Sequence, residues 1–209
     1  MEKYFSVERD AENEIVIERS RFITYVRYVE TEEGARAFIE EIRKKHSLAT
    51  HNCYAFVVNK GAIKRFSDDG EPSGTAGVPI LDAIVQANLV DTCVVVTRYF
   101  GGVKLGAGGL VRAYSKSASE GIKVSGIVEH ALSAIFKLKV SYDRFSKILS
   151  VIQNDYSKTL KTEYFEQVEI TFACLKAYEK TVLENLSESL SGSVDIEKLG
   201  YEYVKLTDL

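Results

Sequence analysis

The chain has 209 residues, of which 45% are apolar, so it holds enough hydrophobic material for one large domain or two small ones. Its formal net charge of −3 and the absence of a basic block exclude an overall attraction to nucleic acids, so such binding would depend on a local patch. The three cysteines are far apart and form no zinc or disulfide motif, no apolar run approaches the ~20 residues of a membrane span, and the first residues show no apolar signal segment. We therefore expect a reduced, cytoplasmic protein that has no membrane association and no cofactor.

The first part of the chain alternates between strand and helix patterns. Apolar periodicity predicts strands at 14–18, 21–29, 54–58, 63–66 and 93–99, and helices at 32–46, from about 77, and from about 110 to 123. Thr31 is expected to cap the first helix, and Pro79 suits the first turn of the second, where a missing N–H costs little. The apolar face of the third helix consists of Leu110, Tyr114, Ala118 and Ile122.

From about residue 131 a second series of elements begins. Clean alternation predicts a strand at 132–140, and the later patterns predict a helix at 145–152, strands at 159–164 and 167–175, a helix at 182–190 and a strand from Val194 to Val204. This β-α-β-β-α-β order is that of a ferredoxin-like domain. We expect an α+β protein with two domains, residues 1–130 and 131–209.

A glycine-rich segment at 101–109 lies between a predicted strand and a predicted helix. Such a turn can present backbone N–H groups to an anion, and the basic residues around it could extend the contact along one helix face. The candidate phosphate-binding residues are Arg98, Gly101, Gly102, Lys104, Gly106, Gly108, Arg112 and Lys116. Two alternatives remain open: a tight loop whose glycines only permit packing, and an ordinary solvated helix face.

A second candidate site combines His51 with the acidic turn that holds Asp68, Asp69 and Glu71. Clustered carboxylates suit a hard cation, and a histidine beside them suits acid–base chemistry. The alternatives are a surface turn built from typical turn residues, and a histidine that only satisfies a strand end. The sequence leaves metal binding undecided. Cys53 lies within an apolar run and is expected to be a buried thiol.

Three segments together resemble the YigZ/IMPACT family: HNCYA at 51–55, FSDDGEPSGTAG at 66–77 and TRYFGGVKLG at 97–106. The resemblance covers roughly residues 15–125. It implies that the N-terminal domain has the fold of the second domain of a small-subunit ribosomal protein. The remaining residues resemble the bacterial C-terminal module of the family, which is similar to domain V of elongation factor G.

The resemblance brings no established catalytic residues, so we expect a binding protein rather than an enzyme. We interpret the chain as a translation-linked regulatory protein whose partner is RNA or the ribosome, with the basic residues contacting phosphates. Two alternatives remain open. One is an enzyme that acts on a phosphate-bearing small molecule at the glycine-rich loop, and the other is a module that binds protein partners.

Overall fold

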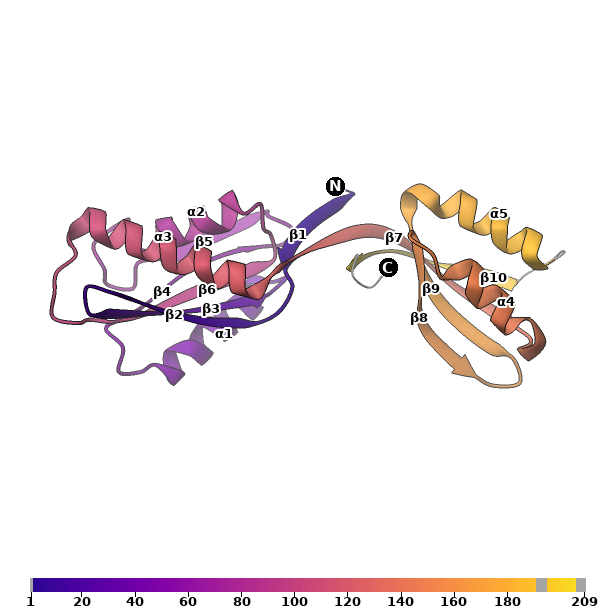
Figure 1. The fold of residues 1–209 in the computed structure, drawn as a ribbon, viewed down its shortest axis with the longest axis horizontal. Helices are drawn as coiled ribbons and strands as arrows, with labels where there is room; N and C mark the ends of the chain where they lie inside the picture. Colours follow the sequence, from indigo (N-terminus) through magenta and orange to yellow (C-terminus); the bar gives the residue numbers. More distant parts are fainter. Residues whose placement is uncertain (1, 191–194, 206–209) are drawn as a thin grey trace. The chain divides into compact units, whose positions relative to one another are not determined.

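The computed structural model describes residues 2–190 and 195–205 of the chain. These residues divide into two compact units: a first unit, Tyr4–Val128, and a second unit made of the residues from Glu129 onward together with Glu2 and Lys3. The described part contains two β-sheets and five α-helices, an α+β architecture (Figure 1). None of the helices described is both long enough and apolar enough to cross a lipid bilayer.

The elements up to residue 125 follow the periodic patterns of the sequence. In chain order they are β1 (Lys3–Val7), β2 (Ala11–Ile17), β3 (Ser20–Tyr28), α1 (Glu32–Lys45), β4 (His51–Val58), β5 (Ile63–Ser67), α2 (Gly77–Gln86), β6 (Thr92–Tyr99) and α3 (Gly106–Ser125). The Thr31 side chain accepts a hydrogen bond from the N–H of Gly34, which confirms Thr31 as the N-cap of α1.

The sheet of the first unit has the strand order β2-β3-β6-β4-β5, and all neighbours are antiparallel. Helices α2 and α3 cover one face, and α1 covers the other (Figure 1). Successive side chains of β6 serve the two faces in turn: Val94 and Val96 pack with α2 and α3, whereas Cys93 and Val95 pack with α1. Burial on both faces explains why the sequence of β6 is a continuous apolar run.

The second unit is built on one antiparallel sheet in which β10, β7, β9 and β8 are successive neighbours. Its elements are β7 (Ile127–Val140), α4 (Tyr142–Ile152), β8 (Ser157–Tyr164), β9 (Val168–Leu175), a short 3₁₀ helix (Lys176–Tyr178), α5 (Glu179–Leu190) and β10 (Asp195–Lys205). Ile148 of α4 and Leu186 of α5 share one core with the stacked rings of Phe136 and Phe172.

Helix α3 begins at Gly106, so the expectation that a glycine-rich loop extends to residue 109 is wrong. Glycine lowers helix stability by only about 1 kcal/mol per residue, and this cost can be outweighed by tertiary packing. The helix buries Leu110, Ala113 and Tyr114 in the core of the first unit. The predicted apolar stripe of this helix is confirmed, because all four of its residues are buried.

One strand and one side chain differ from the sequence-based expectation, and one predicted strand boundary lies outside the described residues. Strand β1 was not expected; its Val7 joins the core, and the carbonyl of Phe5 accepts a hydrogen bond from the N–H of Val90. The apolar pattern of Ile80, Leu81, Ile84 and Val85 predicts that these four residues form the buried side of α2, but Val85 is exposed. Val194, the expected start of the last strand, lies outside the described residues.

Candidate nucleic-acid interface

Three of the candidate cations line one groove on the first unit. Lys104 comes from the loop after β6, and Arg112 and Lys116 lie four residues apart on α3. The groove has a volume of about 440 Å³, and the rest of its lining is Ile17, Glu18, Val103, Leu105, Gly109 and Ala113. Within the part of the chain that the structure describes, none of the three cations is held in an ion pair. We call this feature the cation groove, and its positive charge is available to a ligand.

The N-terminus of α3 lies beside the cation groove and adds to its positive potential. The residue before the helix, Leu105, makes no capping hydrogen bond with its side chain. The first N–H groups of a helix lack partners within the helix, and the aligned peptide dipoles place partial positive charge there. Backbone and side chains thus favour an anion in the same region.

A second pocket adjoins the groove, because Lys104 and Leu105 line both. It has a volume of about 300 Å³, and the rest of its lining is Glu71, Pro72, Arg98, Phe100, Gly106, Ala107 and Leu110. We call it the Phe100 pocket. The end of β6, the acidic turn and the first residues of α3 therefore meet at one place on the first unit.

At the base of this pocket a buried carboxylate is neutralised by a buried guanidinium. Glu71 Oε1 accepts hydrogen bonds from Arg98 Nη1 at 2.7 Å and from the Tyr114 hydroxyl at 2.7 Å. The Glu71 and Arg98 side chains are only 3% and 6% exposed. Burial raises the pKa of Tyr114, so its hydroxyl stays protonated and can donate to Glu71. The three side chains form one polar network that joins the acidic turn, β6 and α3.

His51 and Cys53 on β4 lie at the edge of this network. His51 Nδ1 is 2.8 Å from the carbonyl oxygen of Asp69, which can only accept, so this nitrogen carries the proton. The other ring nitrogen is 3.8 Å from Glu71 Oε2 and is the one available to accept or release a proton. The Cys53 thiol is 2.9 Å from the carbonyl oxygen of Asp68, and burial raises its pKa. Cys53 is a buried thiol, as the sequence predicts.

The two aspartates of the acidic turn hold the local backbone. Asp68 accepts hydrogen bonds from the N–H groups of Gly74, Ala76 and Gly77, and so caps the start of α2. Asp69 accepts from the Asn52 N–H and from Arg43. Within the described ranges 2–190 and 195–205, no set of three histidine, cysteine or acidic side chains is placed to hold a metal ion. The geometry of this turn fits a structural role.

Asp68 should make the stability of the protein sensitive to acid. Burial alone would raise the pKa of this carboxyl, but the hydrogen bonds from Gly74, Gly77 and Ala76 outweigh it and lower the pKa below its ordinary value of 3.8. A lowered pKa in the folded state stabilises the fold above 3.8, and this contribution is lost as the pH falls through the lowered value. We expect Asp68→Asn to be less stable than wild type at neutral pH, and the difference to shrink from about pH 5 to about pH 2.

Urea unfolding of both proteins across this pH range measures the effect. Asp82→Asn removes an exposed carboxylate from α2 and is the matched control for the loss of one charge. A difference between wild type and Asp68→Asn that stays constant with pH would contradict the capping role.

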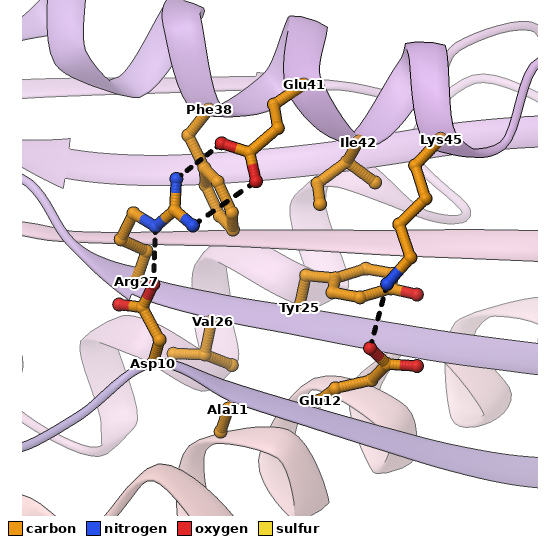
Figure 2. Close-up of a pocket in the computed structure, with 10 residues that line it drawn as sticks. All are labelled: Asp10, Ala11, Glu12, Tyr25, Val26, Arg27, Phe38, Glu41, Ile42 and Lys45. Carbon is orange, nitrogen blue, oxygen red and sulfur yellow. Dashed lines mark hydrogen bonds and ion pairs between the residues drawn. The ribbon is translucent and has the colours of Figure 1, made fainter.

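The charges around another pocket of the first unit, shown in Figure 2, are paired with one another. Arg27 lies between Asp10 and Glu41, with hydrogen bonds of 2.6 and 2.7 Å. On the same side of the pocket as Ile42, Lys45 bonds to Glu12 at 3.0 Å. These cations are already paired with carboxylates, so this pocket attracts a phosphate much less strongly than the cation groove does.

The structure separates the candidate residues into groups. Lys104, Arg112 and Lys116 lie together in the cation groove, whereas Arg98 is buried against Glu71 in the Phe100 pocket. Arg98 therefore does not belong to the strip of exposed cations that the sequence predicts. The physical reason is its position on a strand that is buried on both faces, where a charge needs a partner.

The candidate glycines also have different roles. Gly101 lies against the backbone of Arg19, where an added Cβ would be 2.1 Å from the carbonyl carbon, and Gly102 has a φ of 84°. Gly101 is thus required by packing and Gly102 by backbone conformation. Gly106 and Gly108 lie in α3, and Gly106 lines the Phe100 pocket.

Two residues of the site had no functional role in the sequence-based interpretation. The sequence predicts Tyr114 only as part of the apolar stripe of α3. A buried tyrosine hydroxyl usually needs a hydrogen-bond partner, and this need is the signal that could have identified Tyr114 as part of a polar network. Phe100 directly follows β6, and the residue is 47% exposed. For Phe100, the signal in the sequence is an aromatic residue directly before a glycine-rich turn.

Comparison with known proteins gives consistent matches over nearly the whole chain. Residues 18–122 match the sequence model of the Impact N-terminal domain. The IMPACT family member YvyE of Bacillus subtilis (strain 168) is 43% identical over 206 residues, 98% of this chain and 95% of that protein. YigZ of Escherichia coli (strain K12), also an IMPACT family member, is 31% identical over 86% of this chain and 90% of its own length. A solved structure titled as that of a hypothetical protein is 29% identical, with a TM-score of 0.62, and the match covers 94% of this chain and 97% of that one.

Proposed function

This chain belongs to the IMPACT family, and we propose that it is a translation-linked regulatory protein of the cytoplasm that binds RNA or the ribosome through phosphate contacts. The observation that carries the proposal is the cation groove. Lys104, Arg112 and Lys116 line it without ion-pair partners among the described residues, and Glu18 is the one acidic residue in its lining. An excess of free positive charge beside a helix N-terminus is what a phosphate backbone requires.

The fold gives this proposal further support. We propose that the first unit has the fold of the second domain of a small-subunit ribosomal protein, and that the second unit is ferredoxin-like and similar to domain V of elongation factor G. The β-α-β-β-α-β order from β7 to β10 and the antiparallel neighbours β10, β7, β9 and β8 support the second assignment. Fold similarity alone does not establish function, so the groove remains the main argument.

Removing two cations of the groove should weaken RNA binding and its dependence on salt. Each phosphate contact to a single strand contributes roughly 0.7 to the slope of log affinity against log salt. We expect Arg112→Ala/Lys116→Ala to lower the slope by about 1.4 and to bind roughly 25-fold more weakly near 0.1 M salt. Fluorescence polarisation of a labelled single-stranded RNA at several salt concentrations measures both quantities.

Lys123→Ala is the matched control, because Lys123 is an exposed cation on the same helix that lies outside the lining of the groove. It should leave slope and affinity close to those of wild type. A double variant that binds with the wild-type slope would contradict the role of the groove. Wild type that fails to bind RNA even at low salt would favour the alternative, a module that binds protein partners.

A second candidate function is an enzyme that acts on a phosphate-bearing small molecule. The observation that favours it is the position of the free ring nitrogen of His51, 3.8 Å from Glu71 Oε2, while Glu71 itself lines the Phe100 pocket with Arg98 and Lys104. A histidine beside a carboxylate is a residue type used for general acid–base catalysis, although His51 itself does not line the pocket. The salt titration separates the two functions, because a small-molecule enzyme has no need to hold an RNA strand.

A further inference from the structure

The Phe100 pocket differs in chemistry from the cation groove beside it. Pro72, Leu105, Ala107 and Leu110 supply apolar walls, and Phe100, a residue that is 47% exposed, also lines the pocket. A volume of about 300 Å³ is at the lower end of the range for small-molecule sites. The pocket therefore suits a flat group with apolar faces better than it suits a bare phosphate.

The pocket also contains a buried donor that lacks a partner. Arg98 is 5% exposed, and its Nε is buried without a hydrogen-bond partner among the described residues, although Nη1 is bonded to Glu71. Its guanidinium carbon lies 5.5 Å from the centroid of the Phe100 ring. Buried donors are almost always satisfied, so this pocket-lining guanidinium has hydrogen-bonding capacity that the described residues do not use.

An aromatic face, an adjacent guanidinium and an unsatisfied donor are together the features that recognise a nucleobase. A base stacks on an aromatic ring through its π-face and carries acceptor atoms on its edge. Lys104 lines both the Phe100 pocket and the cation groove, so a nucleotide whose base enters the pocket would have its phosphate beside the groove.

We propose that the Phe100 pocket takes up one unpaired base of a single-stranded RNA, while the cation groove holds the neighbouring phosphates. This inference rests on the proposed RNA binding and specifies its substrate as single-stranded. A base within a duplex is paired and stacked, so it reaches the pocket only after both interactions are lost. Single strands should therefore bind more tightly than duplexes of the same sequence, with little preference among sequences.

Two forms of one labelled 12-mer RNA, single-stranded and annealed to its complement, test this by fluorescence polarisation. Wild type should bind the single strand at least tenfold more tightly. Phe100→Ala should weaken single-strand binding roughly five- to hundredfold, as expected for the loss of one stacked base, and should leave duplex affinity and the salt slope unchanged. Phe100→Tyr should retain tight binding, since it keeps the aromatic face.

Phe66→Ala is the matched control, because Phe66 is also 47% exposed and lies on β5, outside the pocket lining. It should bind both RNA forms as wild type does. A single strand with 2-aminopurine gives a second readout, because the fluorescence of this base depends on its stacking; binding to wild type should change the fluorescence, and Phe100→Ala should reduce that change.

The outcomes distinguish this inference from the proposal on which it rests. Equal binding of the two RNA forms by wild type, or an unchanged single-strand affinity in Phe100→Ala, would overturn the base pocket and leave phosphate binding by the groove intact. Failure of wild type to bind either form at low salt would overturn both.

Discussion

Replacing Arg98 by methionine should lower the free energy of unfolding by about 3–5 kcal/mol. The substitution keeps the approximate length of the side chain but removes the cation that faces Glu71, whose side chain is only 3% exposed. A carboxylate left buried without a counter-charge costs far more than the net value of the ion pair itself. Urea unfolding followed by circular dichroism measures the loss.

Two further variants test the cause of that loss. Arg98→Met/Glu71→Gln removes the unpaired buried charge of Glu71 and keeps an acceptor for the Tyr114 hydroxyl, so it should recover a large part of the stability. Arg21→Met breaks the exposed pair with Glu14 and should cost less than about 1 kcal/mol. If Arg98→Met lowers the free energy of unfolding no more than Arg21→Met does, then Arg98 does not neutralise a buried charge on Glu71.

Gly101→Ala should also destabilise the first unit strongly, by about 3 kcal/mol or more. The added Cβ would lie 2.1 Å from the carbonyl carbon and oxygen of Arg19, and backbone atoms cannot move aside as a flexible side chain can. The turn between β2 and β3 would have to shift, although Glu18 and Arg19 already hold positive φ angles of 45° and 65° there. Unfolding in urea again gives the magnitude.

Two other glycines of the same segment separate packing from backbone conformation. Gly102→Ala meets no atom within 4 Å but keeps a φ of 84°, so it should cost only about 1–2 kcal/mol. Gly108→Ala would meet Arg112 Nη1 at 3.6 Å, an ordinary contact, and should leave stability unchanged or raise it by up to about 1 kcal/mol. Equal losses for Gly101→Ala and Gly102→Ala would show that the close approach to Arg19 is not what requires a glycine.

Local periodicity was sufficient to predict most elements of the fold. The stripe of Ala35, Phe38, Ile39 and Ile42 recurs at helical spacing and is buried as a unit. The strand predicted at 93–99 is a continuous apolar run, and in the structure β6 is covered by α1 on one side and by α2 and α3 on the other. In each case one helix face or one strand carries the signal within a few residues.

The candidate site was harder to predict because its contacts join distant parts of the chain. Arg98 and Glu71 are 27 positions apart, and no local pattern shows that one neutralises the other. From the sequence alone, an arginine in an apolar strand can be either a phosphate ligand or one partner of a buried ion pair. The sequence predicts the start of α3 too late for a related reason. The glycines favour a loop, and this local preference is outweighed by the packing of Leu110 and Tyr114 in the core.

The buried cysteines allow the opening of each unit to be followed separately in the intact chain. Cys53 and Cys93 lie in the core of the first unit and Cys174 in that of the second. Burial raises the pKa of all three thiols, that of Cys174 to about 12, and only the thiolate reacts readily with alkylating reagents. Alkylation must therefore wait for local or global unfolding, so peptide-resolved labelling rates report how often each core is exposed to solvent.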